Sequence, residues 1–147
     1  DRASEMFSNR KAEIYNQKIA AAYESCVKQY QLTKYGLTVV PPKTAAEIVE
    51  EGHALHHCVG GYVSRVANKE CVILFLRETE KPDTPFYTIE VRDGEVQQIR
   101  GKNNSDPPPN VQLYMQVWKQ MKLLPTAAAQ QEQSGVFHCL HFWRRKP

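Results

Sequence analysis

Residues 86–100 have the sequence FYTIEVRDGEVQQIR, and this stretch decides the fold. β-branched and aromatic residues alternate with polar ones on both sides of Asp93-Gly94. This dipeptide favours the left-handed backbone of a two-residue hairpin turn, so we expect antiparallel strands over residues 86–91 and 95–100. The preceding residues 71–77, CVILFLR, have the continuous apolar character of a buried strand. The sequence therefore predicts an antiparallel meander.

Helical patterns flank these strands. Apolar residues recur at helical spacing over residues 4–30, and Thr44 with Glu47 has the capping-box pattern of a second helix that Gly60-Gly61 would stop. Residues 35–40 are β-prone and end at two prolines. A third helix carries one apolar stripe, formed by Val111, Tyr114, Met115, Trp118 and Met121. We predict an α+β fold with N-terminal helices, a three- to four-stranded antiparallel β-meander, and a C-terminal helix packed on the sheet.

Composition indicates one globular domain. The chain has 147 residues, of which 41% are hydrophobic and 24% charged. We divide it into an N-terminal helix (1–36), a core (37–124), and a linker with a basic C-terminal segment (125–147). The net charge of +3 means that any contact with nucleic acid needs a local patch. Without an apolar run of bilayer length or a C-x-x-C pair, we expect a cytoplasmic protein with no membrane association and no disulfide framework.

A dense group of histidines and glycines occupies residues 52–62, GHALHHCVGGY. His56 or His57 is a candidate general acid/base because imidazole titrates near neutrality, and Cys58 is either a nucleophile or a small buried residue. The alternative is that the histidines only cap carbonyls at a helix end, where cations are favoured. His53 and His57 share a helix face, but no acidic residue lies between them as in a metalloprotease. We predict no metal and no cofactor.

The meander carries polar residues at alternate positions. If the strand register brings them together, arginines would hold a phosphate and Glu90 would supply a carboxylate base. The alternative is the solvated face of a half-exposed sheet, followed by a turn that needs Gly101 and an Asn for its backbone. Besides Glu90 as a catalytic residue, we predict these substrate-binding residues: Arg77, Thr88, Gln98, Arg100, Lys102, Asn103 and Asn104.

Four motifs occur in order: EGxxLHHCVGGY at residues 51–62, ILFLR at 73–77, PFYTIE at 85–90 and QxRGKNN at 98–104. Together they resemble the PcfJ-like family, and the resemblance covers about residues 37–120. It implies an accessory protein of a mobile genetic element, since the family occurs on conjugative plasmids, integrative elements and phages. The resemblance implies no particular reaction. Its motifs fall on the candidate site residues.

Two functions are the main hypotheses for these residues, and a structural zinc domain, which would need His53, His57, Cys58 and a residue of the distant tail as ligands, ranks last. The first is a nucleic-acid-processing or nucleotide-handling enzyme that uses His/Glu acid-base chemistry and Arg phosphate contacts without a metal. Its layout is similar to that of small metal-independent ribonucleases. The alternative is a non-catalytic module that binds nucleic acid, or a host or element protein, in element transfer or counter-defence. The preference for the enzyme is slight, and the sequence leaves the oligomeric state open.

Overall fold

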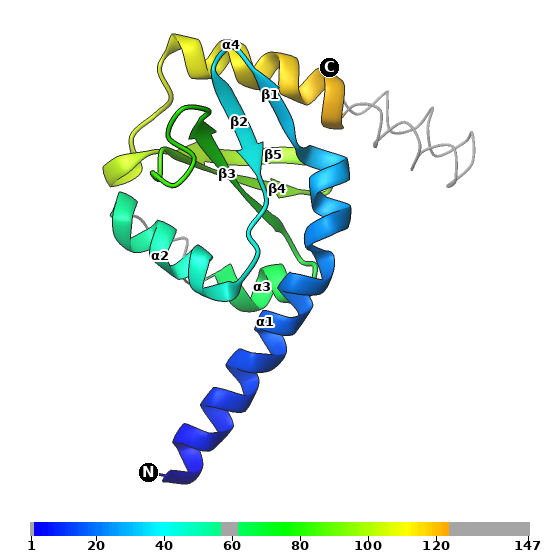
Figure 1. Ribbon diagram of the computed structural model, residues 1–147, viewed down its shortest axis with the longest axis vertical. Helices are drawn as coiled ribbons and strands as arrows, with labels where there is room; N and C mark the ends of the chain where they lie inside the picture. Colours follow the sequence, from blue (N-terminus) through cyan, green and yellow to red (C-terminus); the bar gives the residue numbers. More distant parts are fainter. Residues whose placement is uncertain (1, 57–61, 124–147) are drawn as a thin grey trace, which may run out of the picture.

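The computed structural model describes residues 2–56 and 62–123 of the chain, and it has three layers (Figure 1). A five-stranded sheet with the order β1-β2-β3-β4-β5 forms the middle layer, and all neighbouring strands are antiparallel. Helix α4 covers one face of the sheet, and α2 with α3 covers the other. The long helix α1 runs down one side and its N-terminal part projects beyond the other elements.

The elements follow one another in the order α1 (Arg2–Tyr30), β1 (Leu32–Lys34), β2 (Leu37–Val40), α2 (Ala45–Leu55), α3 (Val63–Ala67), β3 (Val72–Glu78), β4 (Tyr87–Arg92), β5 (Glu95–Arg100), the 3-10 turn η2 (Lys102–Asn104), α4 (Pro109–Trp118) and the π-helical turn η3 (Lys119–Leu123). The predicted α+β class and its meander are confirmed. The sheet has five strands, more than the three to four that were expected, because residues 32–40 form a hairpin of two strands. Its turn, Tyr35-Gly36, has left-handed φ values of 54° and 74°.

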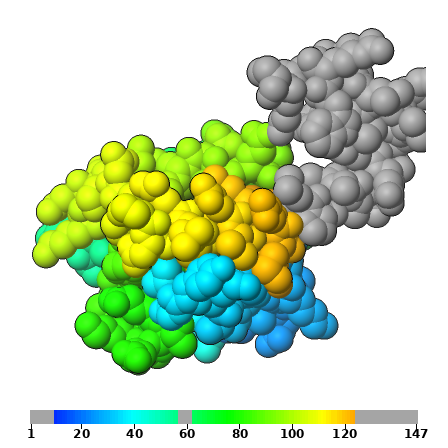
Figure 2. Space-filling view, turned by 90° about the horizontal axis from the view of Figure 1, so that it is seen from above, coloured from blue at the N-terminus to red at the C-terminus, as the bar shows by residue number. Residues whose placement is uncertain are grey.

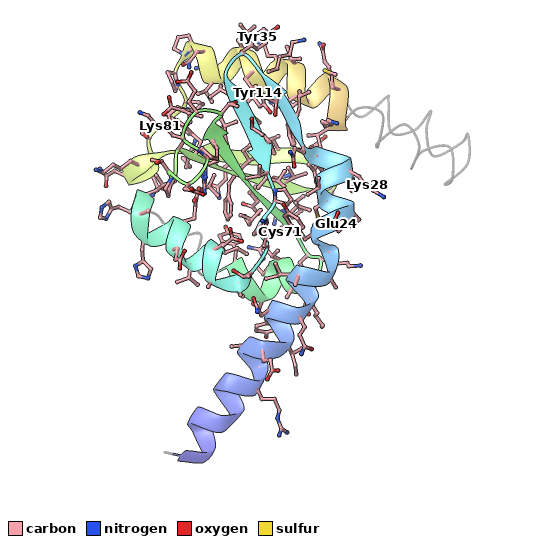
Figure 3. All side chains as sticks on the ribbon, in the orientation of Figure 1. Glu24, Lys28, Tyr35, Cys71, Lys81 and Tyr114 are labelled. Atoms are coloured by element: carbon pink, nitrogen blue, oxygen red, sulfur yellow. The ribbon has the colours of Figure 1, made fainter. Side chains whose placement is uncertain are left out.

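The first core lies between α4 and the sheet. Val111, Tyr114, Met115 and Trp118 of α4 are buried there, as predicted. The Tyr114 hydroxyl donates a hydrogen bond to the Leu32 carbonyl oxygen at 2.5 Å, so this side chain reaches from α4 to the sheet (Figure 3). Figure 2, which views the molecule from above, shows α4, in yellow to orange, beside the cyan β1–β2 hairpin.

The apolar stripe of the C-terminal helix departs from prediction at its end. Met121 is 51% exposed, whereas Leu123 is 5% exposed. The cause is the π-helical turn η3, which changes the helical phase after Trp118. Trp118 is fully buried, and its indole nitrogen donates to the Tyr30 carbonyl oxygen at 2.7 Å. The end of α1 is thereby joined to the end of α4.

The second core lies under α2. The capping box that starts this helix is confirmed, because Thr44 Oγ1 accepts a hydrogen bond from the Glu47 amide at 3.2 Å. Ile48 of α2 packs with Ile73 and Phe75 of β3. The helix ends at Leu55, since His56 has a left-handed backbone (φ 55°, ψ 47°) and its amide donates to the Gly52 carbonyl oxygen. The prediction that this helix runs on to a stop at residues 60 and 61 is therefore wrong, although those two residues lie outside the described part of the chain.

Candidate functional site

A buried ion pair joins α2 to the sheet. Arg77 Nη1 lies 2.9 Å from Glu51 Oε2, and Arg77 Nη2 lies 2.6 Å from Glu51 Oε1. The Thr88 hydroxyl donates to the same Oε2 atom at 3.1 Å. Glu51 is 1% exposed and Arg77 is 8% exposed. This bidentate geometry gives two charge-assisted hydrogen bonds with a fixed mutual orientation.

The position of this pair follows from two periodicities. Glu51 lies three residues after Ile48 and four before Leu55, so it belongs to the stripe of α2 that faces the sheet. On the sheet, Phe75 of β3 lies opposite Thr88 of β4, so the two side chains point to the same face. Arg77 lies two residues after Phe75, so its side chain points to that face as well. Among the described residues, no buried side-chain nitrogen or oxygen lacks a hydrogen-bond partner. The buried charges are therefore compensated.

Glu90 and Gln98 form a second polar pair on this face. The two residues lie opposite each other, and Gln98 Nε2 donates to Glu90 Oε1 at 3.0 Å. Glu90 is 5% exposed. Arg100 lies opposite Thr88 at the sheet edge and makes an ion pair of 2.9 Å with the exposed Asp106. The register thus brings the predicted polar residues of the three strands to one face, although α2 covers its centre.

The turn after β5 supplies the exposed part of the predicted site. Lys102, Asn103 and Asn104 of η2 are all exposed, and η2 contacts α2. Asn103 and Asn104 have left-handed φ values of 59° and 60°, which Asn tolerates better than most residues. Gly101 is needed for close packing, because a Cβ atom there would lie 2.7 Å from a ring carbon of Tyr87.

The structure describes two of the histidines that follow one another near the end of α2. His53 and His56 are both exposed. His57 and Cys58 lie outside the described residues, as does the whole of the predicted segment 125–147. Within residues 2–56 and 62–123, no three His, Cys, Asp or Glu residues gather in a group that could hold a metal ion. The predicted roles of the histidines stay predictions.

Cys71, the residue before β3, is a buried free thiol (Figure 3). Burial raises the pKa of the Cys71 thiol, and the negative charge of Glu90 raises that pKa further. A thiol with a raised pKa is protonated at neutral pH, and the protonated form is a poor nucleophile. Cys71 therefore belongs to the core rather than to the reactive groups.

Glu51 is the polar residue of this region that analysis of the sequence missed as a candidate. A signal for it existed, because a carboxylate in the middle of an apolar helical stripe needs a partner when buried. Its partner, Arg77, is 26 residues away in the sequence, so no local pattern names it.

With this geometry in hand, comparison with known proteins assigns the family. Residues 1–113 match the PcfJ family, described as PcfJ-like protein. The chain belongs to the PcfJ-like family. The match of this PcfJ-like chain extends over α1 and ends inside α4, so it covers the buried ion pair and η2.

A curated relative supports the same assignment. The "Uncharacterized protein Lin1253/Lin1744" of Listeria innocua serovar 6a is 31% identical over 120 residues. The alignment covers 80% of the PcfJ-like chain and 26% of that protein, so the chain spans about a quarter of the relative's length. No solved structure matches significantly. No helix within the described parts of the chain is long and apolar enough to cross a membrane.

Proposed function

We propose that this PcfJ-like chain is a non-catalytic nucleic-acid-binding module of a mobile genetic element. The contact surface is the η2 surface, formed by His53, His56, Lys102, Asn103 and Asn104. One observation supports this proposal: the predicted site residues that the structure describes differ in how accessible they are. Arg77, Thr88 and Glu90 are buried and hydrogen-bonded, whereas the residues of the η2 surface are exposed on adjoining elements.

The buried set supports a structural role for Arg77. To hold a phosphate, its guanidinium would have to leave Glu51, and the carboxylate would remain buried without its counter-charge. That arrangement costs about 3–5 kcal/mol. We infer that Glu51, Arg77 and Thr88 fix α2 on the sheet, and that the fixed helix presents its C-terminal end beside η2.

The exposed set has the chemistry of a weak and salt-sensitive contact with nucleic acid. Lys102 supplies a compact positive charge for a phosphate, and the amides of Asn103 and Asn104 donate and accept hydrogen bonds with bases or sugars. With one permanent cation on the η2 surface, we expect a low salt dependence compared with that of strongly basic proteins.

The test is fluorescence anisotropy with labelled single-stranded RNA, single-stranded DNA and duplex DNA across a salt series. We expect binding that weakens as the salt concentration rises. Lys102→Ala should make the slope of the logarithm of the binding constant against the logarithm of the salt concentration shallower by about one. Asn104→Gly removes an amide while keeping the left-handed backbone accessible, so it should weaken binding without unfolding the turn. Lys119→Ala is the matched control, since Lys119 is an exposed lysine at the end of α4, across the sheet from α2.

Three results would overturn the proposal. The first is the absence of salt-dependent binding to each of the three nucleic acids. The second is a Lys102→Ala variant that binds like Lys119→Ala. The third is cleavage of a labelled strand that persists in EDTA and is lost in folded His56→Ala and Glu90→Gln variants. That last result would establish the enzyme, with acid-base catalysis that needs no metal.

A further inference from the structure

The two edges of the sheet differ in length and in protection. β1 has three residues and ends with Lys34, whereas β5 has six residues. Short strands and lysines are common ways in which proteins protect a sheet edge from pairing. β5 carries charges only at its two ends, Glu95 and Arg100. Its middle, Val96-Gln97-Gln98-Ile99, is uncharged, so within the described part of the chain β5 is the edge better suited to pair with a further strand.

We propose that β5 pairs antiparallel with β5 of a second copy of this chain. The sequence of the strand, EVQQIR, is complementary to itself when reversed. In this register Glu95 lies opposite the partner's Arg100, and Val96 lies opposite the partner's Ile99. Gln97 lies opposite the partner's Gln98. Each contact then occurs twice, as in an isologous two-fold dimer.

The proposed register requires opposed side chains to point to the same face of the sheet. In a regular strand, Val96 and Ile99 are three residues apart and would point to opposite faces. A bulge removes this conflict: Glu90 lies opposite Gln98 and Val91 opposite Val96, which leaves Gln97 as an extra residue. Val96 and Ile99 accordingly both pack against the core on the α4 side.

The charged ends of β5 point to the other face. Arg100 lies opposite Thr88, and Glu95 lies opposite Arg92. Thr88 and Arg92 are four residues apart on β4, so alternation places both on the α2 side of the sheet. Across the two-fold axis, Glu95 and the partner's Arg100 therefore meet on the α2 side, while Val96 and the partner's Ile99 meet on the α4 side.

The driving forces are a continued backbone ladder and the completed burial of Val96 and Ile99, which are half-buried in one copy. The ion pair between Arg100 and Asp106 does not prevent this, because the side chain of Asp106 is 85% exposed and such pairs are weak. An interface based on six residues per strand is small, so we expect a dissociation constant of about 1–100 μM. This inference is independent of the proposed contact with nucleic acid.

The test is a charge exchange followed by sedimentation velocity over a concentration series. In a dimer of the Glu95→Arg variant, the new arginine lies opposite the partner's Arg100 at both ends of the paired strands. In a dimer of the Arg100→Glu variant, the new glutamate lies opposite the partner's Glu95 at both ends. Each variant alone should dimerise at least about tenfold more weakly than the unchanged chain, because attractive pairs become repulsive ones. An equimolar mixture of the two variants restores both opposite-charge pairs, so it should form the dimer again. The exposed-loop variant Asp83→Lys is the control and should dimerise like the unchanged chain.

A monomeric unchanged chain at its highest soluble concentration would overturn the proposal. Single variants that remain dimeric would also overturn it, as would a mixture of variants that stays monomeric. The mixture also separates interface effects from folding effects, since a misfolded variant would not regain dimerisation on mixing. Far-ultraviolet circular dichroism of each variant before mixing checks that both are folded.

Discussion

Removing the buried carboxylate should be among the most damaging changes in this fold. Glu51→Leu leaves the Arg77 guanidinium, which is 8% exposed, with no counter-charge, and deprives Thr88 of an acceptor. Breaking a buried pair from one side costs about 3–5 kcal/mol. A domain of this kind has a free energy of unfolding of about 5–15 kcal/mol, so the variant should lose a large share of it.

Urea unfolding followed by far-ultraviolet circular dichroism measures this loss. With a typical urea dependence of about 2 kcal/mol per molar, the midpoint should fall by about 2 M. The double variant Glu51→Leu/Arg77→Met removes both charges and keeps apolar volume, so it should be more stable than Glu51→Leu alone. Asp106→Asn, which breaks the exposed pair with Arg100, should cost less than about 1 kcal/mol.

The reasoning would be refuted if Glu51→Leu cost no more than Asp106→Asn. It would also be refuted if the two substitutions at positions 51 and 77 were additive. Additivity would mean that Glu51 and Arg77 do not stabilise the fold through each other, whatever their distance in the structure.

Two further changes test other parts of the fold. Gly101→Ala should lower the free energy of unfolding by about 1–3 kcal/mol in a urea titration, because its Cβ atom would lie 2.7 Å from the Tyr87 ring. Burial raises the pKa of Tyr114 well above its usual value. As the pH rises above about 10, the Tyr114 hydroxyl loses its proton in the unfolded chain before it does so in the folded one. The free energy of unfolding should therefore fall above this pH. Tyr114→Phe should make the free energy of unfolding fall less at alkaline pH. Burial also raises the pKa of Tyr30, so Tyr30 should still contribute to this fall.

Each of these two predictions has a matched control. Tyr87→Leu should relieve part of the cost of Gly101→Ala, since it removes the ring that the new methyl group meets. A purely additive double variant would contradict the steric explanation. For the alkaline effect the control is Tyr35→Phe, because Tyr35 is 57% exposed. If Tyr35→Phe changed the alkaline slope as much as Tyr114→Phe, burial would not be its cause.

The fold could be predicted wherever local chemistry determines it. Asp93-Gly94 predicted its hairpin, and the observed φ values of 55° and 76° are those of the expected turn. Tyr35-Gly36 makes a turn of the same hand, but tyrosine rarely adopts that backbone, so the sequence predicted a strand instead. His56 ends α2 in the same unusual conformation, and nothing in its residue type predicts this.

The candidate site could be predicted only where it follows from alternation along a strand. Thr88 and Glu90 share a face, as do Gln98 and Arg100, and the sequence indicated both pairs. It did not show that α2 would cover this face and bring Glu51 to Arg77. That contact depends on how a helix docks on a sheet, which is set by the tertiary structure rather than by neighbouring residues.

The order of the strands has a consequence for how the chain folds. Every strand pairs with strands adjacent to it in the chain, so the β4–β5 hairpin closes a very short loop. The hydrogen bonds from α4 to residues 30 and 32, in contrast, span 88 and 82 residues, and closing such long loops costs more entropy. The kinetic φ-value of a substitution is the share of its effect on stability that appears in the folding rate. We therefore expect high kinetic φ-values in the β4–β5 hairpin and low ones in α4. Substitutions in α4 should then act mainly on the unfolding rate, and substitutions in the hairpin on the folding rate.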